Sequence, residues 1–290
     1  MKLSVIIPAY NALDDLKHCI DSVLKNVNFD FTSVMVINDC SNEETSSYLN
    51  YVNEKFSDKI RVINNEENLG FIKTCNKGIS EQDADIYVLL NSDTIIPSDF
   101  CEKIVSCFQS DKSIGIASPI ASFSSRYYIL KPVKMSLDEI NERLEKVHNT
   151  EYPEVPSAEG FCFCITKETV DKIGVLDTVF GKGYHEEIDY CYRAWKNGIK
   201  SVLIDDLYVY HKNNVSFGAA KRKEYMEINS KVFNERWQNF YKNWVNEHKH
   251  INPIRRIRKE FLGKGPIAFL QCEKATLVKI FGNVVKLRNL

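Results

Sequence analysis

Several acidic side chains and one histidine in this 290-residue chain lie at positions where they could bind a metal ion or act as a general base. Asp93 follows the apolar run 86–90, Glu186, Glu187 and Asp189 cluster behind a glycine-flanked loop, and His211 closes another apolar run. An acid just beyond a buried strand can hold a divalent cation and, through it, a diphosphate. Clustered acids can supply a general base and the groups that support it.

Each of these groups also has a plain structural explanation. Asp93 precedes Pro97, and both residue types favour turns. The three later acids fall in the first turn of a predicted helix, where they complement the helix dipole. A single histidine at a strand end is more often structural than a ligand. The residues alone leave both explanations open.

Buried strands alternating with amphipathic helices must position these groups. The predicted strands are 3–8, 33–39, 60–63, 86–90, 114–117, 159–166 and 201–211. This order predicts an α/β fold with a mostly parallel, doubly wound sheet and helices on both faces. The helix after Gly70 is expected to end at Gly78, because glycine is preferred just past a helix end. No GxGxxG follows the first strand and no GxxxxGK[ST] occurs, which argues against dinucleotide and P-loop sites.

The composition is that of an ordinary soluble globular protein, with 44% hydrophobic and 27% charged residues. Nothing at the start resembles a signal peptide, and no apolar run approaches the ~18 residues that span a bilayer. The nine cysteines are scattered and form no CxxC pair. We therefore expect reduced core thiols in a cytoplasmic protein, without a zinc site.

Two later segments are predicted less sharply. Within 118–157, Ser136 and Glu139 form a capping box ahead of a helical pattern. The segment as a whole is either a lid or acceptor loop or a surface excursion. Residues 220–250 carry aromatic side chains at helical spacing, which indicates packing on the core.

The last forty residues are basic, with nine Lys/Arg against Glu260 and Glu273, on an otherwise acidic chain. Apolar and basic residues take opposite faces of a predicted helix over 254–261, and the pattern repeats at Leu270, Leu277, Phe281 and Val284 with Lys274, Lys279 and Lys286. A basic amphipathic helix favours an anionic membrane surface. An oligomer contact is the alternative. Nucleic acid is not expected, because the acidic body would repel phosphates.

A series of motifs, in order along residues 3–215, resembles the family 2 glycosyltransferases. The motifs are VIIPAYN, VINDCS, NLGFIKTCNKG, LLNSDTIIP, EGFCFCIT, YHEEIDYCYRAWKNG and VYH. The resemblance implies a nucleotide-diphospho-sugar transferase (GT-A) fold in a catalytic domain over 1–219, with a nucleotide-binding half of about 1–117 and an acceptor half of about 118–219. Residues 220–290 would form a helical C-terminal appendage with a basic tail.

The resemblance also implies roles for individual residues. The expected donor-binding residues are Pro8, Ala9, Tyr10, Asn11, Asp39, Asn68, Gly70, Asn76, Asn91, Ser92 and Asp93. Asp93 and His211 would hold Mn²⁺ or Mg²⁺. Glu187 would be the catalytic base, with Glu186 and Asp189 as neighbours.

Two departures from the family pattern matter. The first acid of the DxD motif is Asn91, whose amide oxygen binds a hard cation more weakly than a carboxylate does. The base position holds Glu187 where Asp is more usual, and the longer arm leaves Glu186 versus Glu187 open.

The resemblance implies an inverting hexosyl- or deoxyhexosyltransferase that uses a UDP- or dTDP-sugar and a glycan or lipid-linked acceptor for bacterial surface polysaccharide. It would act in the cytoplasm at the inner face of the cell membrane. A degenerate sugar-nucleotide-binding or assembly subunit is the main alternative. A sugar nucleotidyltransferase is disfavoured, because PAYNALDD lacks the glycine- and arginine-rich loop that such an enzyme needs.

Overall fold

The computed structural model describes residues 1–124, 126–132, 134–147, 150–213, 218–248, 252–262, 277–280 and 283–286. Its elements run in this order: β1 Leu3–Ala9, α1 Leu13–Asn26, β2 Thr32–Asn38, α2 Glu43–Lys55, β3 Ile60–Asn64, α3 Phe71–Ser80, β4 Ile86–Leu90, β5 Thr94–Ile95, α4 Phe100–Ser110, β6 Ile114–Ala121, α5 Leu137–Val147, β7 Cys162–Thr166, α6 Lys167–Ile173, η1 Thr178–Phe180, α7 Glu186–Lys196, β8 Lys200–His211, α8 Gly218–Arg236, α9 Phe240–His248, α10 Ile254–Leu262, β9 Leu277–Ile280 and β10 Asn283–Lys286.

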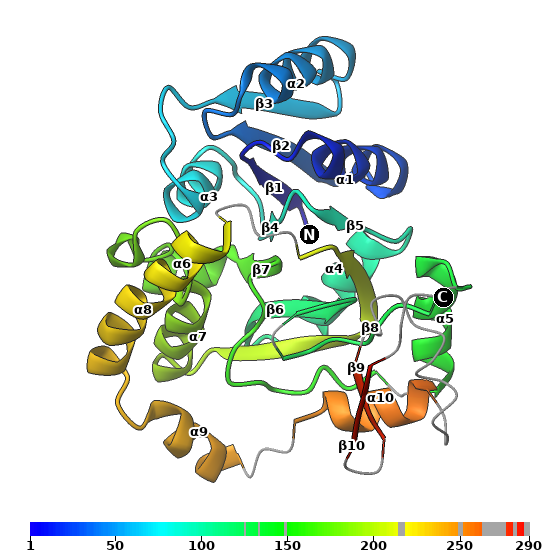
Figure 1. The fold of residues 1–290 in the computed structure, drawn as a ribbon, viewed down its shortest axis with the longest axis vertical. Helices are drawn as coiled ribbons and strands as arrows, with labels where there is room; N and C mark the ends of the chain where they lie inside the picture. Colours follow the sequence, from blue (N-terminus) through cyan, green and yellow to red (C-terminus); the bar gives the residue numbers. More distant parts are fainter. Residues whose placement is uncertain are drawn as a thin grey trace.

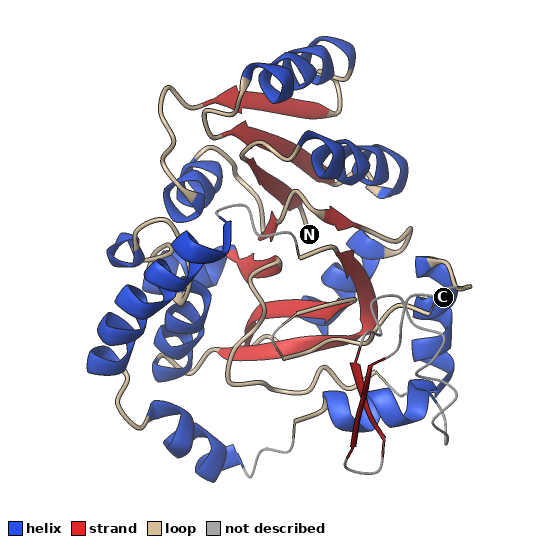
Figure 2. Cartoon of the chain, viewed as in Figure 1, coloured by secondary structure: helices blue, strands red, loops and turns tan. Residues whose placement is uncertain are grey.

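An eight-stranded sheet in the order β3-β2-β1-β4-β7-β6-β8-β5 forms the centre of the molecule. The strands from β3 to β4 are parallel, as are β6 and β8, while β7 and β5 run antiparallel to their neighbours. Figure 2 shows the helices arranged around this sheet. The α/β fold with a mostly parallel sheet is therefore confirmed.

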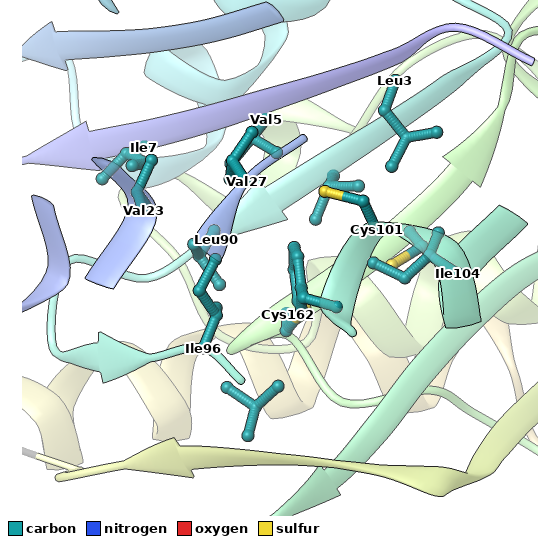
Figure 3. Packing of buried hydrophobic residues seen from close by; sticks show 14 of the residues in the cluster. Leu3, Val5, Ile7, Val23, Val27, Leu90, Ile96, Cys101, Ile104 and Cys162 are labelled. Carbon is teal, nitrogen blue, oxygen red and sulfur yellow. The ribbon is translucent and has the colours of Figure 1, made fainter. Parts of the chain in front are cut away.

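Helices cover both faces of the sheet, so its central strands β1, β4 and β7 are buried along nearly their whole length. All five residues of β4 are buried, as a parallel strand with two covered faces requires. One face packs against α1, α2 and α4, and Figure 3 shows part of this cluster around Leu90, Ile96 and Cys162. The other face packs against α3, α7 and α9.

Gly78 lies inside α3 rather than at its end, so the expected helix stop is wrong. A Cβ at this position would stand 2.4 Å from Cγ2 of Ile6 and 3.2 Å from Cδ1 of Ile37. The glycine therefore lets α3 approach β1 and β2 closely, and helix termination is not its role.

The capping box of α5 is confirmed. The backbone N–H of Ser136 donates to Oε2 of Glu139 at 2.7 Å, and the Glu139 N–H donates to Oγ of Ser136 at 3.2 Å. The aromatic segment also packs on the core, with Trp237, Phe240 and Trp244 buried. The eight cysteines in the described residues are free, as expected for reduced thiols, and seven of them are buried. Cys40 is exposed, so the expectation of a core position is wrong for this residue.

The C-terminal region departs from prediction in two ways. Ile254, Ile257 and Phe261 of α10 are buried in a third cluster, against α5 and β8, so this apolar face cannot enter a lipid surface. Residues 277–280 and 283–286 form an antiparallel strand pair instead of a helix, consistent with their β-branched content. Leu270, Lys274 and Phe281 lie outside the described residues. Within the described ranges, no helix has the length and apolar character needed to cross a bilayer.

Candidate active site

One pocket of about 430 Å³ lies at the carboxyl ends of β1, β2 and β4 and at the start of α7. It brings together Asp93, Glu187 and His211, which are separated by up to 118 positions in the chain. Eleven predicted site residues line it: Pro8, Ala9, Tyr10, Asp39, Asn68, Asn91, Ser92, Asp93, Glu186, Glu187 and His211. Asn11, Gly70, Asn76 and Asp189 are not among the lining residues.

Two walls of this pocket differ in origin. We call the residues at the strand ends the strand wall: Pro8, Ala9, Tyr10, Asp39, Asn68, Phe71, Asn91, Ser92 and Asp93. We call the residues from the second half of the domain the helix wall: Ser124, Arg126, Glu159, Gly160, Tyr184, His185, Glu186 and Glu187.

Asp39 organises the strand wall. Its Oδ1 accepts hydrogen bonds from Nδ2 of Asn65 at 2.9 Å and the backbone N–H of Leu69 at 2.8 Å, and its Oδ2 accepts from the N–H of Gly70 at 2.9 Å. Its carbonyl oxygen accepts from Nδ2 of Asn68 at 3.2 Å. The carboxylate therefore fixes the loop between β3 and α3. A carboxylate offers about four acceptor sites, so Oδ2 can accept one more bond.

Three predicted binding residues stand behind this wall and brace it. Asn11 exchanges hydrogen bonds with Ser41 and Asn42, which joins the end of β1 to the start of α2. The Asn76 amide bonds both backbone groups of Leu176. Gly70 has φ +81° at the start of α3, a conformation that favours glycine.

Asp93 and His211 meet across β5 and β8, where Thr94 pairs with His211. Nδ1 of His211 lies 3.0 Å from the carbonyl oxygen of Phe123. A carbonyl can only accept, so Nδ1 donates to it, and Nε2 is the ring nitrogen that faces Oδ1 of Asp93, 3.3 Å away. Phe161 stacks on the ring at 4.9 Å and fixes its plane.

This pair fits a divalent cation. An imidazole nitrogen and a carboxylate oxygen both ligate divalent ions, and two adjacent ligands of an octahedral ion with bonds near 2.1 Å are separated by about 3 Å. Within the described ranges, no group of three or more His, Cys, Asp or Glu residues could hold a metal. Two protein ligands suit an ion that takes its remaining ligands from phosphates and water.

Glu186 and Glu187 begin α7, with Glu186 buried and Glu187 half-buried. Each has an Oε2 atom without a hydrogen-bond partner in the described structure. Burial raises the pKa of both carboxyls, and the charge of Glu187 raises that of Glu186 further. For Glu187, the positive charge of Arg126 opposes this rise. Two adjacent buried carboxyls resist joint ionisation, so Glu187 ionises before Glu186.

Arg126 and Glu159 were missed by the sequence analysis. The guanidinium of Arg126 donates a hydrogen bond to Oγ of Ser157. Burial lowers the pKa of Arg126, but the negative charges of Glu159 and Glu187 outweigh this effect, so the pKa is raised overall. Gly160 packs beside Glu187, and a Cβ there would stand in ordinary contact at 3.6 Å from Cγ of Glu187. The one available signal was an arginine within an otherwise uncharged Ser- and Tyr-rich stretch, ASFSSRYY.

Asp189 faces away from the pocket. It accepts hydrogen bonds from Nε of Arg193 at 2.9 Å, and from Nη1 of Arg236 and Nε1 of Trp237 at 2.8 Å each. These contacts tie α7 to the end of α8, and the two helices lie side by side in Figure 1. Its contacts are those of a brace between helices.

His185 and Lys182 complete the pocket and were also missed. Burial lowers the pKa of His185, with Arg126 adding to the effect, so this ring is neutral near pH 7. Lys182 lies between two glycines in GKGYH, and its glycine-flanked position was the available signal.

The comparisons with known proteins agree with this geometry. The family model described as glycosyl transferase family 2 matches residues 4–174. Because this match covers more than half of the chain, the protein belongs to glycosyl transferase family 2. Glu187 and His211 lie beyond the matched range.

Relatives and solved structures extend the likeness at lower identity. An uncharacterized glycosyltransferase of Haemophilus influenzae is 32% identical over 112 residues, covering 39% of this chain and 34% of the relative. The structure of GalNAc-T7 with UDP, GalNAc and Mn²⁺ has a TM-score of 0.63 at 16% identity, covering 90% of this chain and 54% of that one.

The mannosyltransferase PcManGT of Pyrobaculum calidifontis, in complex with GDP-Man and Mn²⁺, has a TM-score of 0.57 at 15% identity. That likeness covers 92% of this chain and 71% of the other. Both structural matches confirm the GT-A fold. The chain spans about a third of the length of the H. influenzae relative.

Proposed function

We propose that this protein is a metal-dependent inverting glycosyltransferase that moves a hexose or deoxyhexose from a nucleotide-diphospho-sugar to an acceptor hydroxyl. The observation that carries the proposal is one pocket holding both a cation-binding pair, Asp93 and His211, and a buried carboxylate, Glu187. The structural neighbours support it, because one was solved with UDP and Mn²⁺ and the other with GDP-Man and Mn²⁺.

Asp93 and His211, with the weaker ligand Asn91, would hold Mn²⁺ or Mg²⁺. When bound, such an ion would neutralise charge on the departing nucleoside diphosphate. The strand wall would bind the nucleoside, since its loop is already fixed by Asp39 and needs no ordering on binding.

Glu187 is the residue we assign as base. It would take the proton of the acceptor hydroxyl as the new glycosidic bond forms on the opposite side of the anomeric carbon from the leaving diphosphate. A carboxylate with a raised pKa is a stronger base than an exposed one, and the positive charge of Arg126 favours its ionised form. Burial and the charge of Glu187 both raise the pKa of Glu186, which supports Glu187 over Glu186 as the base.

The acceptor would be a glycan or a lipid-linked sugar of bacterial surface polysaccharide. Because the apolar face of α10 is buried, that helix could contact a membrane only by electrostatic attraction. Exposed Arg255 and Lys259 would supply this attraction, since Arg256 pairs with Glu151 at 2.7 Å. Cosedimentation with anionic vesicles at low and high salt would measure this attraction.

Donor binding and release of nucleoside diphosphate test the proposal together. The melting temperature should rise with a UDP-, dTDP- or GDP-sugar in the presence of Mn²⁺, and less so in EDTA, because a ligand that binds only the folded state stabilises it. Incubation with that donor and bacterial glycan or lipid-linked acceptors should then release the diphosphate. Binding without release in any acceptor mixture would favour the non-enzymatic binding subunit, and no binding at all would refute both.

A further inference from the structure

The loop between η1 and α7 presents a lysine to the pocket. Gly181 and Gly183 flank Lys182 and have φ values of +63° and +144°, a region that side chains with a Cβ rarely enter. The two glycines allow the chain to turn around Lys182, which lines the pocket beside the strand wall.

This loop is held from two sides. Nδ2 of Asn229, a buried residue of α8, lies 2.8, 2.7 and 3.0 Å from the carbonyl oxygens of Phe180, Gly183 and Tyr184. On the other side, the N–H of Phe71 donates to the Lys182 carbonyl at 3.2 Å. The aliphatic stem of Lys182 rests on Gly70, where a Cβ would stand 2.9 Å from its Cγ. The position of Lys182 is therefore fixed by packing.

The side-chain amide of Asn68 connects the ammonium group of Lys182 to the strand wall. Its Nζ donates to Oδ1 of Asn68 at 2.7 Å, and Nδ2 of the same amide donates to the carbonyl oxygen of Asp39 at 3.2 Å. In the described residues, no carboxylate lies within ion-pair distance of Lys182. The guanidinium of Arg126, by contrast, interacts with the charges of Glu159 and Glu187. Lys182 thus has donor capacity left, since an ammonium carries three N–H groups.

We propose that Lys182 reads the nucleobase of the donor. Its ammonium would donate to an exocyclic carbonyl oxygen, while the open acceptor site on Oδ2 of Asp39 would take the neighbouring ring N–H. Uracil and thymine carry this pair of groups, as does guanine. Cytosine and adenine present an amino donor and a ring acceptor instead. The amino donor would face the ammonium donor of Lys182, and the ring acceptor would face the carboxylate of Asp39. This inference rests on the proposed function and adds a contact that selects keto-type bases over amino-type bases.

Calorimetry with UDP and CDP tests this role, because the two ligands share the ribose and diphosphate and differ in the base edge. The protein should bind UDP more tightly than CDP in Mn²⁺. Lys182→Met keeps the stem on Gly70 and removes the donor. It should weaken UDP binding about ten- to a hundredfold, the loss expected for one charge-assisted hydrogen bond, while CDP affinity stays nearly constant.

Matched variants separate the possible outcomes. Lys73→Met, at an exposed position of α3 away from the pocket, should leave both affinities unchanged, and Lys182→Arg should retain part of the UDP preference. Equal weakening of UDP and CDP by Lys182→Met would assign the lysine to the diphosphate and overturn base reading, as would no weakening in a variant whose melting temperature is unchanged. A wild-type protein that binds UDP and CDP equally would overturn this inference alone. One that binds neither, nor any sugar nucleotide, would overturn the proposed function with it.

Discussion

The two walls of the pocket differ in whether their buried polar atoms have hydrogen-bond partners. In the strand wall, the Asp39 carboxylate is already hydrogen-bonded to its own loop, and no buried side-chain polar atom of the described strand wall lacks a partner. The helix wall keeps four such atoms without partners: Ser124 Oγ, His185 Nδ1, Glu186 Oε2 and Glu187 Oε2. Leaving a buried polar atom unpaired costs roughly 1–3 kcal/mol.

Under the proposed function, this difference separates donor binding from proton transfer. A wall whose polar groups are satisfied keeps its shape whether or not a ligand is present, which suits recognition. A wall with unpaired buried carboxyls holds groups whose proton affinity is raised, which suits proton transfer. Substitutions in the two walls should therefore have different signatures, and four experiments would test that separation.

The largest effect is expected at Glu187. Glu187→Gln keeps the shape and removes the base, so the transfer rate should fall by about 10²–10⁴-fold while donor affinity stays within about twofold of wild type. Diphosphate release and calorimetry would measure the two quantities. Glu235→Gln, at an exposed position of α8, is the matched control and should be silent. Full turnover by Glu187→Gln would remove the base assignment.

Asp93 should come next, and its effect should be on binding. Asp93→Ala removes the carboxylate of the cation pair, so donor affinity in Mn²⁺ should fall at least about tenfold, and the difference between Mn²⁺ and EDTA should disappear. Asn91→Asp adds the missing acid and should shift metal affinity in the opposite direction. Unchanged donor affinity in Asp93→Ala would show that the strand wall works without this ligand.

Substitutions at Gly78 and Gly160 should distinguish an effect on packing from an effect on the transfer rate. Gly78→Ala forces a methyl group against Ile6 and should cost roughly 1–3 kcal/mol of stability, seen as a lower melting temperature. Gly160→Ala would place a methyl group in ordinary contact with the Glu187 side chain, so the melting temperature should hold and any effect should fall on the transfer rate. A lower melting temperature for Gly160→Ala with none for Gly78→Ala would contradict this expectation.

The smallest effect concerns pH. The pKa of Glu186 in the folded protein lies well above its ordinary value of 4.5, so this group stabilises the fold at pH values below 4.5 and loses that contribution as the pH rises through the raised value. Glu186→Gln, which is always neutral, should melt a few degrees higher than wild type at pH 8, with roughly 2–4 °C for each kcal/mol. The difference should vanish near pH 4. A constant difference across this range would mean that Glu186 does not titrate as inferred.

The sequence predicted the strand wall well because its signals are local. Apolar runs such as Ile86–Leu90 end at polar residues, and parallel strands bring those ends to one edge of the sheet. Gly78 was misassigned because a glycine needed for close packing looks the same in sequence as one that ends a helix. The two-residue strand Thr94–Ile95 was missed, since its pairing with β8 depends on residues more than a hundred positions away.

The helix wall was predicted only in part for the same reason. Glu186 and Glu187 stood out as neighbouring acids, but the cation that distinguishes them, Arg126, arrives from a different loop. Asp189 was grouped with them by spacing, yet Arg236, the last residue of α8, and Trp237, which follows it, hold its carboxylate away from the pocket. The apolar face of α10 was assigned to a membrane because an apolar helix face is equally suited to a membrane and to the protein's own core.

The short pairing of β5 with the end of β8 has a consequence for the order in which the protein acquires activity during synthesis. The strand wall is complete once the first hundred residues or so have been made, whereas His211 can join Asp93 only after β8 has emerged and paired. Under the proposed function, a chain made only as far as β5 would carry the residues of the strand wall without the complete cation pair. The metal-dependent step would therefore wait for the last strand of the sheet.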